Sequence, residues 1–231
     1  MFSLGLKIEK LSKRYGKGLF SRETELFRDV SFKLEAGKTF GLTGPSGTGK
    51  STLGKIIVGL EKPSQGDVFY KGSSIFELRG SEKKVFRRKV QMMFQDPLDA
   101  FNPRKKIERS LLDILSLLKI PGSKGPDKIR LMLKTVGLNE EVLLRFPAQL
   151  SGGQLQRLAL GRILLLEPAF IILDEPTSAL DVSVQAQILQ LLKKVQAREK
   201  LGYLLISHDE AVVRFMADYC GKLEHGSLSL A

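Results

Sequence analysis

The stretch Gly44-Pro45-Ser46-Gly47-Thr48-Gly49-Lys50-Ser51 decides the fold of this chain. It fits the pattern G-x-x-x-x-G-K-[ST], in which glycines let the backbone curl until successive N–H groups point at one anion. The positive end of a following helix adds to the attraction. The pattern therefore predicts a phosphate-binding loop, with Lys50 reaching the β- and γ-phosphates of a nucleotide and the Ser51 hydroxyl binding Mg²⁺.

The sequence on either side gives this loop its expected surroundings. A short apolar run over 39–43 predicts the strand that enters the loop, and 51–60 predicts the helix that leaves it. Upstream, 6–11 and 30–34 alternate apolar and polar residues, which is typical of half-buried strands. The first third of the chain is therefore expected to be rich in strands and to end in a strand, a loop and a helix.

A second candidate site lies at the end of an apolar run in the last third. Residues 170–173 predict a buried parallel strand that delivers Asp174 to its carboxyl end, where open α/β sheets bind ligands. We expect Asp174 to hold Mg²⁺ through water and Glu175 to orient and deprotonate the attacking water. His208 follows the next apolar strand, 203–206, so its ring should lie near Glu175 and donate to the γ-phosphate.

The segment Leu150-Ser151-Gly152-Gly153-Gln154 precedes a helical run over 155–166. The serine and the glutamine form an S-x-x-Q capping box, so a well-made helix start is one explanation. The two glycines, at about 1 kcal/mol each within a helix, favour a further role. Their N–H groups at a positive helix end predict a second anion site, and a second phosphate site suggests that two chains share one nucleotide.

Composition narrows the class of protein. The 231 residues include one cysteine and two histidines, which argues against a disulfide framework and a His/Cys metal cage. No apolar run reaches the ~18 residues of a membrane span, and Met1–Lys10 lacks the pattern of a signal peptide, so a soluble cytoplasmic protein is expected. The net charge, 37 − 25 = +12, suits an anionic partner such as a nucleotide, a nucleic acid or a membrane, or simply keeps the protein in solution.

Taken in order, these motifs resemble those of the ATP-binding cassette (ABC) ATPases. The segment 150–154 resembles the family's signature sequence, Gln95 resembles the Q-loop glutamine, and 178–181 resembles the D-loop. His208 resembles the switch histidine, and Tyr15 resembles the aromatic residue that stacks on adenine. The resemblance covers almost the whole chain.

The resemblance implies a fold and a domain plan. The fold is an α/β P-loop NTPase (RecA-like) core with a mainly parallel sheet, an N-terminal antiparallel β subdomain and an inserted α-helical subdomain. The chain would be a single ABC ATPase domain, 1–231, with its core in 1–96 and 156–231 and the helical subdomain in about 97–155. Helical periods on either side of the break Pro121–Pro126 fit that insertion.

The resemblance also implies the site residues. The catalytic residues are Glu175, His208 and Lys50, and the Mg²⁺ ligands are Ser51, Gln95 and Asp174. The residues expected to bind ATP are Tyr15, Gly44, Pro45, Ser46, Gly47, Thr48, Gly49, Lys50, Ser51, Thr52, Gln95, Ser151, Gly152, Gly153, Gln154, Asp174 and Asp181. The implied cofactors are ATP and Mg²⁺.

Two longer stretches, 94–104 and 174–188, look like the dipeptide/oligopeptide/nickel importer branch of the family. This implies an ATPase subunit that powers uptake of nickel, free or chelated, or of short peptides. Its expected partners are a paralogous ATPase subunit or a second copy of the chain, two transmembrane permease subunits and an extracytoplasmic solute-binding protein, with no nucleic acid. The expected location is peripheral, on the cytoplasmic side of the cell (inner) membrane.

Other functions stay open at this stage. A soluble ABC-type ATPase acting on nucleic acid would suit the charge. However, the repair and chromosome-organising members insert a long coiled coil between the phosphate loop and the signature, and the translation-type members carry two cassettes in one chain. Here the gap between the loop and the signature is 151 − 51 = 100 residues, without sustained heptads. A nucleotide sensor that does not hydrolyse ATP would suit the loop, but Glu175 argues against it. Among importers, a dipeptide or oligopeptide system is the alternative to nickel.

Overall fold

The computed structural model describes residues 5–16 and 24–230, which divide into two compact units. The first unit contains the chain up to 92 together with 169–175 and 199–230, and the second contains 93–168 and 176–198. Residues 1–4, part of the N-terminal stretch considered above, lie outside the described residues. No helix within the described ranges is long and apolar enough to pass through a lipid bilayer.

The larger sheet of the first unit surrounds the phosphate loop. Its strand order is β10-β9-β3-β8-β7-β6. Strands β9, β3, β8 and β7 run parallel, and β10 pairs antiparallel with β9. The strands are β3 (Thr39–Thr43), β6 (Val90–Met93), β7 (Phe170–Asp174), β8 (Gly202–Ile206), β9 (Tyr219–Glu224) and β10 (Ser227–Leu230).

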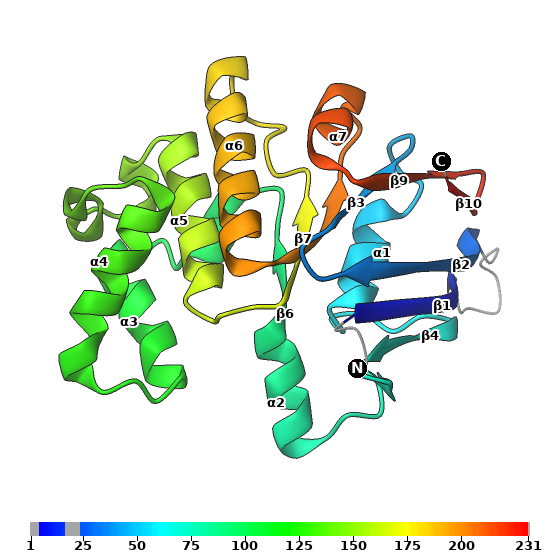
Figure 1. Ribbon diagram of the computed structural model, residues 1–231, viewed down its shortest axis with the longest axis horizontal. Coiled ribbons are helices and arrows are strands. Elements are labelled where there is room, and N and C mark those ends of the chain that lie inside the picture. Colours follow the sequence, from blue (N-terminus) through cyan, green and yellow to red (C-terminus); the bar gives the residue numbers. More distant parts are fainter. Residues whose placement is uncertain (1–4, 17–23, 231) are drawn as a thin grey trace. The chain divides into compact units, whose positions relative to one another are not determined.

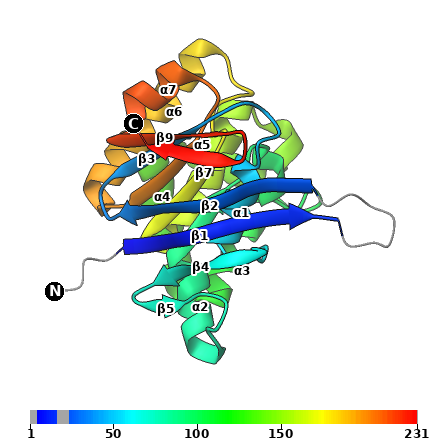
Figure 2. The same ribbon diagram turned by 90° about the vertical axis from the view of Figure 1, so that its right-hand side faces the viewer.

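The second sheet is antiparallel, in the order β2-β1-β4-β5, and Figure 2 shows its three long strands side by side. The strands are β1 (Gly5–Tyr15), β2 (Thr24–Glu35), β4 (Gln65–Tyr70) and β5 (Ser73–Ser74). The register of β1 shifts between Ile8 and Leu11, and Lys10 takes a φ of 46°. This bulge moves the inward-facing set by one residue, so Leu6, Ile8 and Leu11 are all buried.

Helix α1 (Lys50–Ile57) packs on the larger sheet; the first unit also contains α2 (Gly80–Lys89) and α7 (Glu210–Met216). A Cβ at Gly54 would lie 3.1 Å from a methyl group of Ile172 on β7 and 3.2 Å from one of Ile206 on β8. The glycine therefore lets α1 lie close to both strands. This contact holds the start of α1, and with it the phosphate loop, at the edge where β3 ends.

The second unit is helical. Its helices are η1 (Pro97–Ala100), α3 (Ile107–Leu117), η2 (Gly122–Lys124), α4 (Gly125–Val136), η3 (Glu140–Leu144), η4 (Pro147–Gln149), α5 (Gly152–Leu164) and α6 (Val182–Glu199). Helix α4 lies against α5 and α3 (Figure 1). The expected break at 121–126 is shorter than predicted, because Pro126 lies in the first turn of α4, where a missing N–H costs nothing.

Candidate functional site

The phosphate loop is kept in its curled form by its glycines. Gly44 has a φ of +142°, and a Cβ there would lie 2.1 Å from the carbonyl oxygen of Leu223 on β9, so a side chain does not fit. Gly49, with a φ of +95°, is the N-cap of α1. Within the described chain, the first turn of α1 has no acidic residue and no side-chain cap. Its N–H groups are therefore free to bind an anion.

The Lys50 ammonium lies inside this loop. Its Nζ donates to the carbonyl oxygens of Gly44 and Pro45, each at 2.8 Å, and the residue is buried. Burial lowers the pKa of Lys50, while the negative charges of Glu175 and Asp174 act in the opposite direction. A phosphate group bound in the loop would meet a cation that has already lost much of its water.

Ser51 and Asp174 form the second part of the site. The Ser51 Oγ donates to the Asp174 Oδ1 at 2.9 Å, and Asp174 is buried at the end of β7. Burial raises the pKa of this carboxyl group, and the Ser51 hydrogen bond opposes the shift. Hydroxyl and carboxylate oxygens are ligands that Mg²⁺ prefers, so the pair fits this ion. Gln95, the third expected ligand, lies in the second unit, where its Nε2 donates to the Ser178 Oγ at 3.4 Å.

Glu175 and His208 meet at the same edge of the sheet. The Glu175 Oε1 accepts the His208 backbone N–H at 3.1 Å and lies 2.8 Å from the ring Nδ1. The proximity expected from the parallel strands is therefore confirmed. Glu175 has a φ of 48°, which turns the chain sharply after β7 and gives its side chain a different partner from that of Asp174. With Nδ1 engaged, Nε2 remains for a phosphate, to which it donates only as the imidazolium.

The signature segment in the second unit starts α5 with the expected capping box. The Ser151 Oγ accepts the N–H of Gln154 at 3.3 Å, and the Gln154 Oε1 accepts the N–H of Ser151 at 3.1 Å. The glycines also have a packing reason, because a Cβ at Gly152 would lie 3.2 Å from Leu180 and one at Gly153 would lie 2.6 Å from Val184. The anion site at this helix end stays a prediction.

Asp181 lies at the start of α6 in the same unit. Its Oδ1 accepts the N–H of Val184 at 3.0 Å, and its carbonyl oxygen accepts the N–H of Gln185 at 2.8 Å. The residue therefore caps α6. A role of Asp181 towards ATP stays a prediction.

Tyr15 ends β1 with its side chain half exposed, and it is held by residues that the sequence did not reveal. The hydroxyl donates to the Glu61 Oε1, and the Lys13 Nζ lies 4.8 Å from the centroid of the ring. Thr52, an expected site residue in the first turn of α1, lies close enough to the Tyr15 phenol to act on its pKa, which it lowers. Burial and the Glu61 bond raise the pKa of the phenol. Glu61 is 46 residues from Tyr15, and no sequence pattern connects the two.

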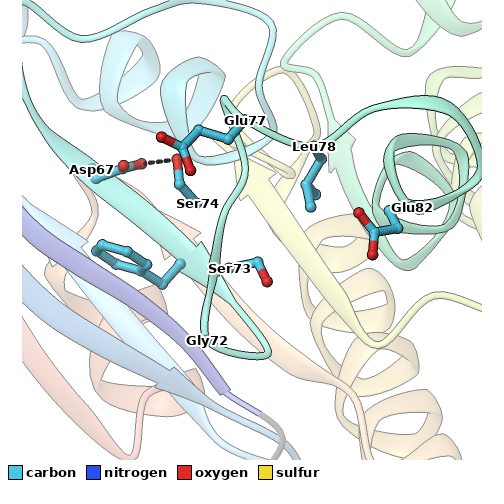
Figure 3. A pocket seen from close by; sticks show the side chains of 8 residues that line it. Asp67, Gly72, Ser73, Ser74, Glu77, Leu78 and Glu82 are labelled. Atoms are coloured by element: carbon cyan, nitrogen blue, oxygen red, sulfur yellow. Dashed lines mark hydrogen bonds between the residues drawn. The ribbon is translucent and has the colours of Figure 1, made fainter.

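A separate pocket of about 480 Å³ in the first unit is lined by carboxylates from β4 and α2 and from the segment between them (Figure 3). The Asp67 Oδ1 accepts the Ser74 hydroxyl at 2.9 Å, and Glu77 and Glu82 also line the space. None of the predicted site residues lines it. Because its charge would repel phosphates, this pocket does not compete with the loop as a nucleotide site.

Comparison with known families decides where this geometry belongs. The ABC transporter family model matches residues 27–178. The chain belongs to the ABC transporter family. This assignment agrees with the loop, the two carboxylates and the capped signature segment described above.

Curated relatives of this ABC ATPase are named as ATP-binding proteins of peptide transport and nickel import. The chain is 38% identical to the oligopeptide transport ATP-binding protein OppF of Streptococcus mutans, over 96% of this chain and 73% of that protein. It is 43% identical to the dipeptide transport ATP-binding protein DppF of Haemophilus influenzae, over 87% of this chain and 63% of that protein. It is 41% identical to the nickel import ATP-binding protein NikE of Shigella boydii, over 94% of this chain and 82% of that protein. The resemblance to the peptide and nickel branch is therefore confirmed.

Solved structures support the fold. An ATP-binding cassette described as dimeric, in a post-hydrolysis state bound to ADP and Pi, aligns with a TM-score of 0.82 and 29% identity, over 97% of this chain and 98% of that chain. The protein cbiO1 from Clostridium perfringens, described as part of an ABC transporter complex, aligns with a TM-score of 0.84 and 27% identity. The alignment covers 99% of this chain and 87% of that chain. The expected P-loop NTPase fold and the enzyme class, an ABC-type ATPase, are confirmed.

Proposed function

We propose that this chain is the subunit that binds and hydrolyses ATP in an importer of nickel, free or chelated, or of short peptides. The observation that carries the proposal is the cluster at one sheet edge: Lys50 in the loop, Ser51 paired with Asp174, and Glu175 paired with His208. The names of the relatives, which specify oligopeptide, dipeptide and nickel transport, support the importer branch.

The cluster supplies what hydrolysis of a phosphoanhydride requires. Glu175 would take a proton from water as the water oxygen bonds to the γ-phosphorus and the bond to the ADP oxygen breaks. Lys50 and the N–H groups of the loop would stabilise the charge on the phosphate oxygens. Ser51 and Asp174 are the residues here that would hold Mg²⁺, with Gln95 as a third ligand. When bound, Mg²⁺ supplies positive charge that neutralises the phosphates.

The rest of the site would come from a second ATPase chain. Ser151, Gly152 and Gly153 of one chain would bind the γ-phosphate held by the loop of the other, with Gln154 and Asp181 supporting that contact. Tyr15 would stack on the adenine. The dimeric state of the solved cassette supports this arrangement. A paralogous chain is our first choice for the second subunit, and a second copy is the alternative.

The proposal places this chain within a larger assembly. As a single ABC ATPase domain, 1–231, it would bind two transmembrane permease subunits through the helical unit that follows Gln95. It would lie on the cytoplasmic side of the cell membrane, and an extracytoplasmic solute-binding protein would deliver the cargo. A dipeptide or oligopeptide cargo is the alternative to nickel, because relatives with both kinds of name match over most of the chain.

The catalytic part of the proposal is tested by Glu175→Gln. Phosphate release should fall about 10²- to 10⁴-fold, because a general base contributes that much, while the Kd for ATP changes little. Glu82→Gln is the matched control, since Glu82 is an exposed glutamate on α2 and should leave turnover unchanged. Unchanged turnover in Glu175→Gln would show that another group activates the water.

The transport part is tested in cells. Deletion of this chain should abolish uptake of radiolabelled nickel or of a labelled short peptide, and Glu175→Gln should fail to restore it. Loss of nickel uptake alone would identify nickel as the cargo, and loss of peptide uptake alone would select the alternative. If both uptakes persist in the deletion strain, the importer proposal is wrong.

A further inference from the structure

The side chain of Tyr15 is surrounded by polar groups that fix its position. Its hydroxyl donates to the Glu61 carboxylate and meets Thr52, and the Lys13 ammonium lies over the ring, 4.8 Å from the centroid. The Lys13 Nζ also lies 2.8 Å from the Glu61 Oε1 and donates to the carbonyl oxygen of Lys62 at 2.9 Å. One carboxylate oxygen therefore joins the phenol and the ammonium.

This network is better sheltered than an ordinary surface ion pair. The Lys13 and Glu61 side chains are only 12% and 26% exposed, whereas Tyr15 is 46% exposed. The turn that carries Glu61 is also tied to β1, because Ser64 N–H donates to the Ser12 carbonyl at 2.8 Å and Arg14 N–H donates to the Ser64 Oγ at 3.0 Å. The supporting groups are thus held in place by backbone bonds, while the ring they support still faces solvent.

We infer that Glu61 and Lys13 position Tyr15 as the platform on which the adenine ring stacks. Lys13 lies over one face of the ring as a cation–π partner, so a base would stack on the opposite face. Glu61 holds the hydroxyl end and prevents the ring from turning, so the platform is preorganised before the nucleotide arrives. The inference rests on the proposed function, because it concerns the adenine end of the same ATP site.

The placement also connects the two ends of the nucleotide. Lys50 begins α1 and Thr52 lies in its first turn, while Glu61 lies just beyond its last turn. The network therefore connects Tyr15 to the helix that carries the phosphate loop. The distance between the base platform and the phosphate cradle is then set by one rigid element. Glu61 should therefore increase the affinity for a nucleotide, which has a base, and should not change the affinity for a bare chain of phosphates.

The test compares two ligands, ATP and inorganic tripolyphosphate, on the full chain with Mg²⁺ present. Glu61→Ala should raise the Kd and the KM for ATP about three- to tenfold, which corresponds to the net contribution of one typical hydrogen bond, and leave kcat and the Kd for tripolyphosphate within about twofold. Tyr15→Phe keeps the ring but loses the hydrogen bond to Glu61, so it should weaken ATP binding by a similar factor. The double variant should be little worse than either single variant, because both remove the same bond.

Two controls separate this role from a general loss of structure. Glu82→Ala removes an exposed glutamate of the same unit and should change neither Kd. Glu61→Gln keeps an acceptor for the phenol and should restore part of the ATP affinity. An equal loss for both ligands in Glu61→Ala, or unchanged ATP binding, would overturn the inference. Failure of the unmodified chain to bind ATP would instead overturn the proposed function.

Discussion

At the scale of single residues, the site depends on two adjacent carboxylates with different surroundings. Asp174 is buried and bonded to Ser51, whereas Glu175 turns away through a positive φ and contacts His208. Burial raises the pKa of Asp174, so the ionised form that would hold Mg²⁺ is disfavoured by the fold itself. Function and stability therefore oppose each other at this position.

Asp174→Asn should separate these two effects. The amide oxygen can still accept the Ser51 hydroxyl, but no charge is buried, so in the absence of nucleotide and Mg²⁺ the melting temperature at neutral pH should rise or stay the same. Because the folded-state pKa of Asp174 is raised, the ionised carboxyl group lowers stability above that pKa, and protonation removes this loss as the pH falls through it. The advantage of the Asn variant should therefore shrink as the pH is lowered from neutral towards 3.8, the ordinary pKa of an aspartate.

The measurement is a series of thermal melts across that pH range, together with phosphate release. Hydrolysis should be almost abolished, because one Mg²⁺ ligand has lost its charge. The exposed Asp99→Asn serves as the control and should shift neither quantity. A variant less stable than the original chain at every pH would show that the ionised form of Asp174 is favoured in the fold.

At the scale of elements, the signature segment is shaped by how closely α5 approaches α6. Gly153 has an ordinary backbone conformation, yet a Cβ there would lie 2.6 Å from the Val184 Cγ1. Valine is stiff at χ1, so this methyl group does not move aside cheaply. The glycine is required by packing within the second unit, whatever anion its N–H group binds.

Gly153→Ala should therefore destabilise the chain by about 1–2 kcal/mol, since overpacking exceeds the gain in helix propensity. Adding Val184→Ala should recover about 1 kcal/mol or more of this loss, because it removes the clashing methyl group. Denaturant unfolding of the two single variants and the double variant gives the coupling energy. Gly122→Ala, with open space around its Cβ, is the control. Strictly additive losses would show that the two residues do not clash.

Local patterns predicted the parts of the fold that lie close together in the sequence. The loop, the strand that ends at Asp174 and the cap at Ser151 each carry their own signal, and the parallel order of β7 and β8 was enough to bring His208 to Glu175. Features that depend on distant residues were not predictable. The bulge at Lys10 and the Glu61 contact arise from pairing between segments that share no pattern.

At the scale of the whole molecule, the two halves of the proposed ATP site lie in different units. Lys50, Ser51, Asp174, Glu175 and His208 belong to the first unit, whereas Ser151 and its glycines belong to the second. If each nucleotide takes the loop from one chain and the signature from another, hydrolysis needs two chains. Turnover per chain should then rise with protein concentration, because it follows the population of dimers.

Mixing two inactive variants tests this sharing directly. Lys50→Ala removes the loop cation, and Ser151→Glu places a negative charge at the opposing helix end, so each variant alone should lack activity. In a mixed dimer, one nucleotide still meets an intact loop from the Ser151→Glu chain and an intact signature from the Lys50→Ala chain. An equimolar mixture should recover up to about a quarter of the original phosphate release, since half of the dimers are mixed and each has one of two sites intact. Lys50→Ala mixed with Glu175→Gln is the control. Both substitutions lie in the half of the site that contains the phosphate loop, so no intact site can form in a mixed dimer. If the unmodified chain hydrolyses ATP alone, equal activity in the two mixtures would show that each chain completes its own site. An unmodified chain that is inactive alone would instead indicate that the second chain is the paralogous subunit.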